Sequence, residues 1–204
     1  MKNLKKTALI LIFIFSSAVF YAQAFGDGKN ILSVGFGLPS TPKIQDEYNQ
    51  YSDKSAYVYH NFGTVVLKYE HGLQKYFGVG INLEYSGASA TYNDSVYNPS
   101  THKNVNYQNN LTSNLFGFFG RLNAHYPIGE SFDVFGGVGL GYTYDIENAN
   151  NNQPGLISST KSSEWNFDYQ LTVGARYMIK PHFGLFVEFG RATTVAQAGI
   201  TLGF

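Results

Sequence analysis

Apolar and polar residues alternate along most of the chain, and the last ten residues, 195–204, show the pattern most clearly. Every second residue from Ala196 to Phe204 is apolar, and most of the residues between them are small or polar. A period of two is typical of a β-strand whose two faces meet different surroundings. About ten residues is also the length of a tilted strand that crosses a bilayer. This segment therefore predicts a membrane-spanning strand.

The same alternation predicts further strands at 30–38, 63–70, 76–88, 114–126, 132–145, 164–178 and 183–190. Short turns centred on Leu73, Gly129 and Pro181 connect some of them. Long polar segments at 39–62, 89–113 and 146–163 connect others, and we expect these segments to be loops. An even number of strands joined alternately by short and long connections is typical of outer-membrane barrels. The pattern predicts an all-β fold, an eight-stranded, antiparallel, up-and-down transmembrane barrel.

The residue types on the two strand faces indicate which face points outward. In a soluble barrel or sandwich, the apolar face would point inward. Here that face carries many bulky aromatic residues, and eight strands leave an interior only just wide enough for side chains. The other face carries charged residues and most of the strand glycines, which would make room in a narrow lumen. We therefore expect the apolar face to meet lipid and the polar face to line the lumen.

The amino-terminal residues have the features of a secretory signal peptide. Lys2, Lys5 and Lys6 precede an apolar run at 7–20, and a small-x-small cleavage pattern ends at Ala24. Cleavage after Ala22 or after Ala24 fits the pattern. The alternative is an anchor helix, but the run is shorter than the ~20 residues that a spanning helix needs. We expect residues 1–24 to be removed and residues 25–204 to form one barrel domain.

Composition excludes several classes of function. The chain has 14 basic and 14 acidic residues, and loss of the three signal-peptide lysines leaves a net charge of −3. The absence of a basic patch makes nucleic acid an unexpected partner. The absence of cysteine excludes disulfides and thiolate chemistry. Aromatic residues make up 17% of the chain, and many lie near strand ends, as in the aromatic belts at both membrane interfaces.

The strand pattern, the signal peptide and the ending at residues 199–204 resemble the small outer-membrane β-barrel family, similar to the OmpA transmembrane domain and OmpX-type proteins. The resemblance covers about residues 29–204. It implies a place in the outer membrane of a Gram-negative cell envelope, with outer-membrane lipid around the barrel. It also implies that Phe204 is a carboxyl-terminal assembly signal for the barrel-assembly machinery, and that the protein is a monomer. The ligand of its extracellular loops stays unknown.

Charged residues in the middle of strands are the candidate site. We expect a charge network in the lumen, formed by Lys68, Glu70, Glu84, Arg121, Asp168, Arg176 and Glu188. The residues could form an ion path, or a structural set of ion pairs that compensates buried charge. We expect the second, with Arg121 and Arg176 paired to Glu84 and Glu188.

No pattern of residues indicates catalysis. The five histidines lack metal-ligand spacing on a shared face, and His125 has no evident serine partner. We therefore expect no catalytic residue, no metal and no cofactor. The predicted function is that of a non-enzymatic outer-membrane protein, structural or surface-binding through its extracellular loops. The alternatives are a narrow, porin-like channel and a lipid-modifying enzyme.

Overall fold

Eight antiparallel strands make up the fold in the computed structural model, which describes residues 24–40, 57–100, 102–153 and 156–204. The strands are β1 (Asn30–Pro39), β2 (Tyr57–Gln74), β3 (Phe77–Asn98), β4 (Lys103–Ile128), β5 (Phe132–Gln153), β6 (Leu156–Lys180), β7 (Phe183–Arg191) and β8 (Thr194–Gly203). The described residues include no helix that could cross a membrane. The expected signal peptide lies outside them except for Ala24, and it stays a prediction.

Each strand pairs with its neighbours in the sequence, and β8 pairs with β1 to close the ring. At the closure, the Ser33 hydroxyl donates to the Thr201 hydroxyl at 2.8 Å. The backbone of Asn30 exchanges hydrogen bonds of 2.8 and 2.9 Å with that of Phe204, so the two ends of the barrel domain lie side by side. The predicted eight-stranded, up-and-down barrel is confirmed.

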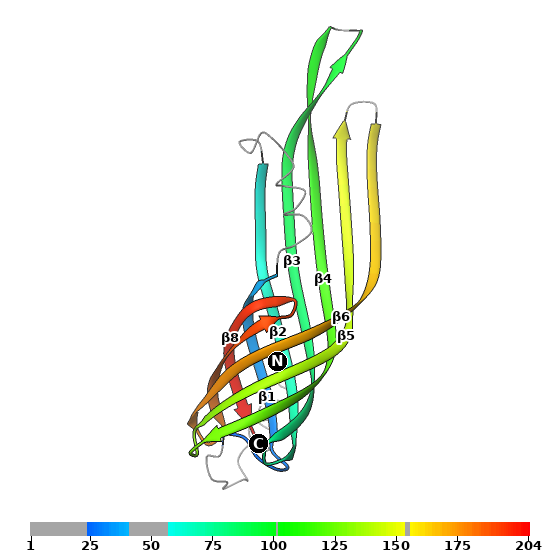
Figure 1. Ribbon diagram of the computed structural model, residues 1–204. Helices are drawn as coiled ribbons and strands as arrows, with labels where there is room; N and C mark the ends of the chain where they lie inside the picture. Colours follow the sequence, from blue (N-terminus) through cyan, green and yellow to red (C-terminus); the bar gives the residue numbers. More distant parts are fainter. Residues whose placement is uncertain (1–23, 41–56, 101, 154–155) are drawn as a thin grey trace, which may run out of the picture.

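The strands differ greatly in length. β1, β7 and β8 have 10, 9 and 10 residues, whereas β2 to β6 have 18 to 26. The long strands therefore rise beyond the ring on one side and form a wall, which we call the palisade (Figure 1). We call the opposite end, with the short turns and both ends of the barrel domain, the turn end.

The expectation that residues 89–113 and 146–163 form loops is wrong, because most of these residues belong to strands of the palisade. Ser89 pairs with Thr112, and Asn148 pairs with Lys161. These stretches are mostly polar, and a small apolar cluster of Ala90 with Ala88, Tyr92 and Leu111 is too short to give the sustained alternation that marks the ring. Of the third expected loop, residues 57–62 also belong to a strand, and 41–56 lie outside the described residues.

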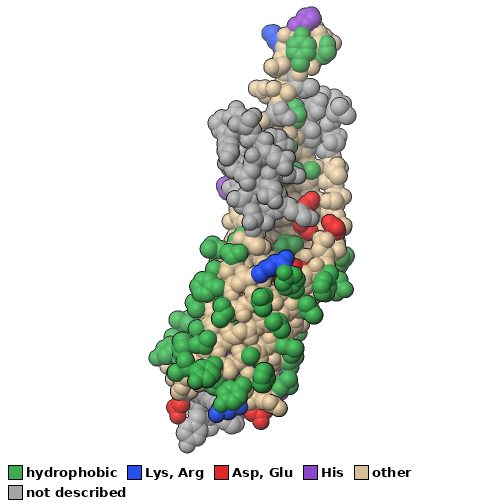
Figure 2. Space-filling view, in the orientation of Figure 1, with side chains coloured by type: hydrophobic (Ala, Val, Ile, Leu, Met, Phe, Trp, Pro, Cys, Tyr) green, Lys and Arg blue, Asp and Glu red, His purple; other side chains and the backbone are tan. Residues whose placement is uncertain are grey.

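The outer face of the ring is apolar, as the sequence predicts. Leu140 and Phe167 are each 64% exposed and Trp165 is 61% exposed. Figure 2 shows such hydrophobic side chains spread over the ring on the face in view. A water-soluble barrel would bury these residues, since a large side chain gains about 1.5–3 kcal/mol on burial. The exposed apolar belt fits a lipid surrounding.

The inner face combines buried aromatic residues with glycines. Phe119, Phe135 and Phe186 are at most 4% exposed. At Gly174 a Cβ atom would lie 2.5 Å from Cζ of Phe135 and 2.6 Å from the carbonyl oxygen of Val187. Glycine is needed at this position because the aromatic side chain of Phe135, on β5, occupies the space beside it in the narrow lumen. The interior is filled with side chains.

Candidate functional site

Charged side chains from six successive strands meet inside the ring. Inward positions of β2 to β7 supply them, because the inner face receives every second residue. Asp133 is fully buried and Glu188 is 1% exposed. Four further charged residues of the network are 4–5% exposed, namely Glu70, Glu84, Arg121 and Arg176. Burial of this extent requires each charge to be paired or hydrogen-bonded.

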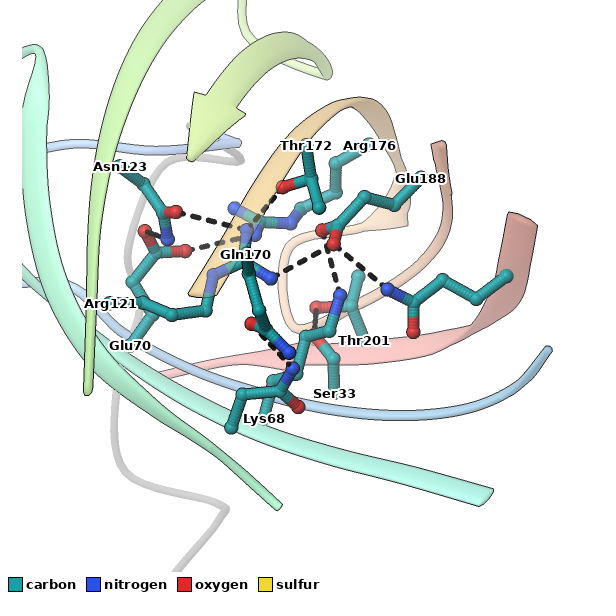
Figure 3. A network of polar contacts seen from close by, with 12 residues as sticks. Ser33, Lys68, Glu70, Arg121, Asn123, Gln170, Thr172, Arg176, Glu188 and Thr201 are labelled. Carbon is teal, nitrogen blue, oxygen red and sulfur yellow. Dashed lines mark hydrogen bonds and ion pairs between the residues drawn. The ribbon is translucent and has the colours of Figure 1, made fainter. Parts of the chain in front are cut away.

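Glu188 is the hub of the central cluster (Figure 3). Its Oε2 atom accepts a hydrogen bond from Lys68 at 2.7 Å, and its Oε1 atom accepts one from Arg121 at 2.9 Å. Gln197 donates to the same Oε1 atom at 2.8 Å. Arg121 also donates to the hydroxyl of Thr172 at 2.7 Å. One carboxylate thus compensates two cations at the centre of the lumen.

A second cluster lies nearer the turn end. Arg176 donates to Glu70 at 3.1 Å and to Asp133 at 3.5 Å. Between the two carboxylates, the His125 ring lies 2.7 Å from Glu70 and 2.8 Å from Asp133, one nitrogen on each. Carboxylates only accept, so both nitrogens donate when the imidazole is doubly protonated. Asn123 joins the clusters by donating to Glu70 at 2.5 Å and accepting from Arg121 at 3.2 Å.

The segment before β1, residues 24–29, covers this second cluster. The Phe25 ring stacks on His125 with centroids 3.5 Å apart and an interplanar angle of 7°. Gly28 donates its backbone N–H to the carbonyl of Gly72 at 2.9 Å. A Cβ atom at Gly72 would collide with the carbonyl oxygen of Gly26. The glycine at 72 therefore lets the segment lie against the turn end.

Glu84 lies on the palisade side of the network and has amide partners. Asn82 donates to its Oε1 atom at 2.6 Å and Gln170 donates to the same atom at 2.9 Å. The structure thus brings six of the seven expected residues into buried polar clusters. Asp168 is the exception, because it lies further toward the palisade, where its Oδ1 atom accepts the backbone N–H of Tyr169 at 2.8 Å.

The expected pairing is correct for Arg121 with Glu188 and wrong for Arg176. Arg176 lies directly opposite Asp133 across β5 and β6, which places its guanidinium between Asp133 and Glu70. The sequence reasoning missed Asp133 and the role of His125. The short turn before β5 pairs His125 with Phe135 and so sets Asp133 on the neighbouring inward position. Counting from that turn could have placed the two together.

This arrangement is suited to holding charge rather than to turning over a substrate. Both nitrogens of His125 bind carboxylates, which leaves the imidazole no free nitrogen to activate a hydroxyl. Within the described residues, no group of three or more His, Asp and Glu could hold a metal ion. The space between the clusters is about 20 Å³, enough for about one water molecule.

Comparison with known proteins agrees with this architecture. The sequence pattern of the family described as "Outer membrane protein beta-barrel domain" matches residues 7–203. No curated protein sequence matches the chain. The solved structure of the outer membrane protein OprG from Pseudomonas aeruginosa is similar to this chain with a TM-score of 0.50 and 12% identity, over 91% of this chain and 99% of that one.

Two other solved structures are similar at lower TM-scores. The attachment invasion locus protein Ail of Yersinia pestis gives a TM-score of 0.46 and 14% identity, over 87% of this chain and 96% of Ail. The N-terminal beta-barrel domain of Pseudomonas aeruginosa OprF gives a TM-score of 0.43 and 12% identity, over 88% of this chain and all 100% of that one. At these identities the likeness concerns the fold alone.

Proposed function

The chain belongs to the outer membrane protein beta-barrel family, and from this we propose that it is a non-enzymatic surface protein that binds an extended peptide segment through its palisade. In this family of folds, short turns face the periplasm and longer segments face outward. The palisade then stands outside the membrane, and the turn end faces the periplasm.

The single observation that carries the proposal is an open strand edge. β6 pairs with β7 only from Leu171 onward, whereas its pairing with β5 continues to Leu156. In the part of the chain that the structure describes, residues 156–170 thus have a partner strand on one side. Unpaired N–H and C=O groups along such an edge are a template for another strand. Adding an extended peptide to a sheet edge is a recurrent mode of recognition.

The filled lumen supports this proposal over the narrow channel. Lys68, Arg121 and Glu188 meet at the centre, and the space beside them admits about one water molecule. Steady single-channel conductance in a planar bilayer would instead favour the channel.

A peptide-array screen tests the proposal. Folded protein in detergent micelles is applied to an array of extended peptides, beside two shortened variants. Deletion of residues 148–161 removes the outer part of the β6 edge, and deletion of residues 94–107 removes the tip of the β3–β4 hairpin but keeps that edge. We expect binding to fall at least about tenfold in the first variant only. Equal binding by all three proteins would contradict the proposal.

A further inference from the structure

The small space between the two clusters of the lumen has the features of a ligand site. Its volume is about 20 Å³, and residues of β1 to β7 line it. Figure 3 shows the polar side chains of both clusters converging on this part of the lumen. A space of this volume holds about one water molecule, so a ligand here is of about that size.

The lining of this space carries an excess of positive charge. Its charged residues are three cations and two carboxylates, namely Lys68, Arg121, Arg176, Glu70 and Glu188. Both carboxylates already compensate cations, Glu188 in the central cluster and Glu70 in the cluster nearer the turn end. One positive charge of the lining therefore has no counterpart in the lining itself.

The charged residues next to the lining do not remove this excess. His125 is a cation when both of its nitrogens donate, and it is balanced by Asp133 beside it. Lys29 lies near Arg176, and Glu84 lies near Lys68. Counted as fully ionised, these four neighbours cancel one another. An uncompensated buried charge is costly, so the excess calls for a counter-ion.

Unpartnered N–H groups give a second, independent indication of a ligand. Arg121 and Arg176 line the space and are each 4% exposed, and the Nε atom of each has no hydrogen-bond partner. Acceptor atoms without a partner, on Asp133 and Gln197, belong to residues that do not line the space. Buried polar groups in native proteins nearly always have a partner. The lining therefore suits a ligand that accepts hydrogen bonds and donates none.

We propose that this space binds a single chloride ion. Chloride brings one negative charge, it accepts from several N–H groups, and it has no hydrogen to donate. A water molecule would fill the space but would leave the charge excess uncompensated. Sulfate, phosphate and carboxylate ions are too large for a space of about one water molecule. The ion is thus a counter-ion shared by the two clusters.

The inference goes beyond peptide binding and does not depend on it, because the site lies inside the lumen and not on the strand edge. The full chain is unfolded in urea and refolded into detergent micelles in chloride-free gluconate buffer at pH 6, since the packed lumen would retain an ion acquired earlier. Equilibrium dialysis against radioactive chloride then counts the bound ions. We expect one chloride ion per folded chain, which bromide displaces and sulfate does not.

Two substitutions in the lining should change the affinity for chloride in opposite directions. Lys68→Met removes a cation and should weaken chloride binding by at least about tenfold. Glu188→Gln removes a carboxylate and should strengthen chloride binding by at least about tenfold. Lys161→Met, the same substitution as the first but at an exposed position of the palisade, should leave the affinity unaltered. A general loosening of the lumen would instead weaken binding in both lining variants.

Thermal unfolding in chloride and in gluconate at equal ionic strength shows which variants fold and gives a second measurement. A ligand that binds the folded state raises the unfolding midpoint, so chloride should raise it in the wild type, and raise it more in Glu188→Gln. If neither lining variant folds, the number of ions bound by the wild type and the competition by bromide and sulfate decide. The inference is overturned if the refolded wild type binds no more chloride than empty micelles, if sulfate competes as well as bromide, or if folded Lys68→Met binds chloride as the wild type does. Weaker binding by folded Glu188→Gln would also overturn it.

Discussion

Single residues in the lumen combine complete burial with full charge, and Glu188 shows what this requires. Its carboxylate is the shared partner of Lys68, Arg121 and Gln197. Loss of this one negative charge would leave two buried cations without their counter-ion. A buried ion pair need not stabilise a fold in itself, but removal of one partner is costly.

We therefore expect Glu188→Gln to lower the free energy of unfolding by about 3–5 kcal/mol. Denaturant unfolding in detergent micelles measures the change, and Glu130→Gln at the exposed turn is the control. A loss below about 1 kcal/mol would show that Lys68 and Arg121 find other partners.

Lys29, which lies just before β1, makes the stability of the protein depend on pH. Burial, reinforced by the nearby charge of Arg176, lowers the pKa of its ammonium group from 10.5 to about 8, although Asp133 acts in the opposite direction. The folded protein thus loses this proton at a lower pH than the unfolded chain. Between about pH 8 and 10.5 the unfolded chain binds more protons, so this group makes stability rise with pH.

We expect Lys29→Met to raise the free energy of unfolding relative to the wild type, and to raise it more at pH 7 than at pH 10. At pH 7 the wild type carries the cost of a partly buried charge, and at pH 10 the folded wild type is largely free of it. Unfolding curves of both proteins at the two pH values give the comparison. A wild-type-to-variant difference that is constant with pH would contradict the expectation.

Residue contacts were predictable from the sequence only in part. The inward position of each charge follows from alternation, because every second residue shares a face. The partner of Arg176 does not follow, since the pairing of β5 with β6 begins at Gln153 and Leu156, in a polar stretch that the sequence pattern assigns to a loop, so the register cannot be counted from a recognised turn. Arg121 and Glu188 lie on strands that are not neighbours, so their contact depends on the closure of the ring.

The strand segments of the ring and those of the palisade differ in how strongly the sequence pattern specifies them. Within the ring, one strand face meets lipid and the other meets the packed lumen, so a shift of one residue would invert every side chain. Above the ring most residues are polar, and the few apolar ones, such as Ala90 and Tyr92, give only a short periodic signal. For this reason the sequence pattern predicts the strands of the ring correctly, whereas it predicts loops where the palisade strands lie.

We expect the palisade and the ring to be separable in stability. Deletion of residues 94–107 removes the part of the β3–β4 hairpin beyond the last β4–β5 pair, Asn109 with Asn151. It removes no contact of the ring, so the free energy of unfolding of the barrel should change by less than about 1 kcal/mol, as for exposed positions. Loss of folding in micelles would show that the tip takes part in forming the ring.

The ring is polar inside and apolar outside, so the lipid around it stabilises the fold. Leu140 lies midway along the ring part of β5 and is 64% exposed. We expect Leu140→Arg to cost about 2–4 kcal/mol, the cost of a cation at the midplane of a bilayer. Ser159→Arg, on an exposed position of the palisade, should be nearly neutral. Unfolding in lipid vesicles measures both, and equal effects would contradict the placement of the ring in lipid.

The hydrogen bonds between Asn30 and Phe204 close the ring at a place no different in kind from any other strand pair. A closed cylinder does not depend on where its polypeptide starts. The two ends could therefore be joined by a short linker and the chain reopened at the β3–β4 tip. With the orientation proposed above, such a circular permutant would place both new ends outside the cell and would offer a site for displaying a fused protein on the surface.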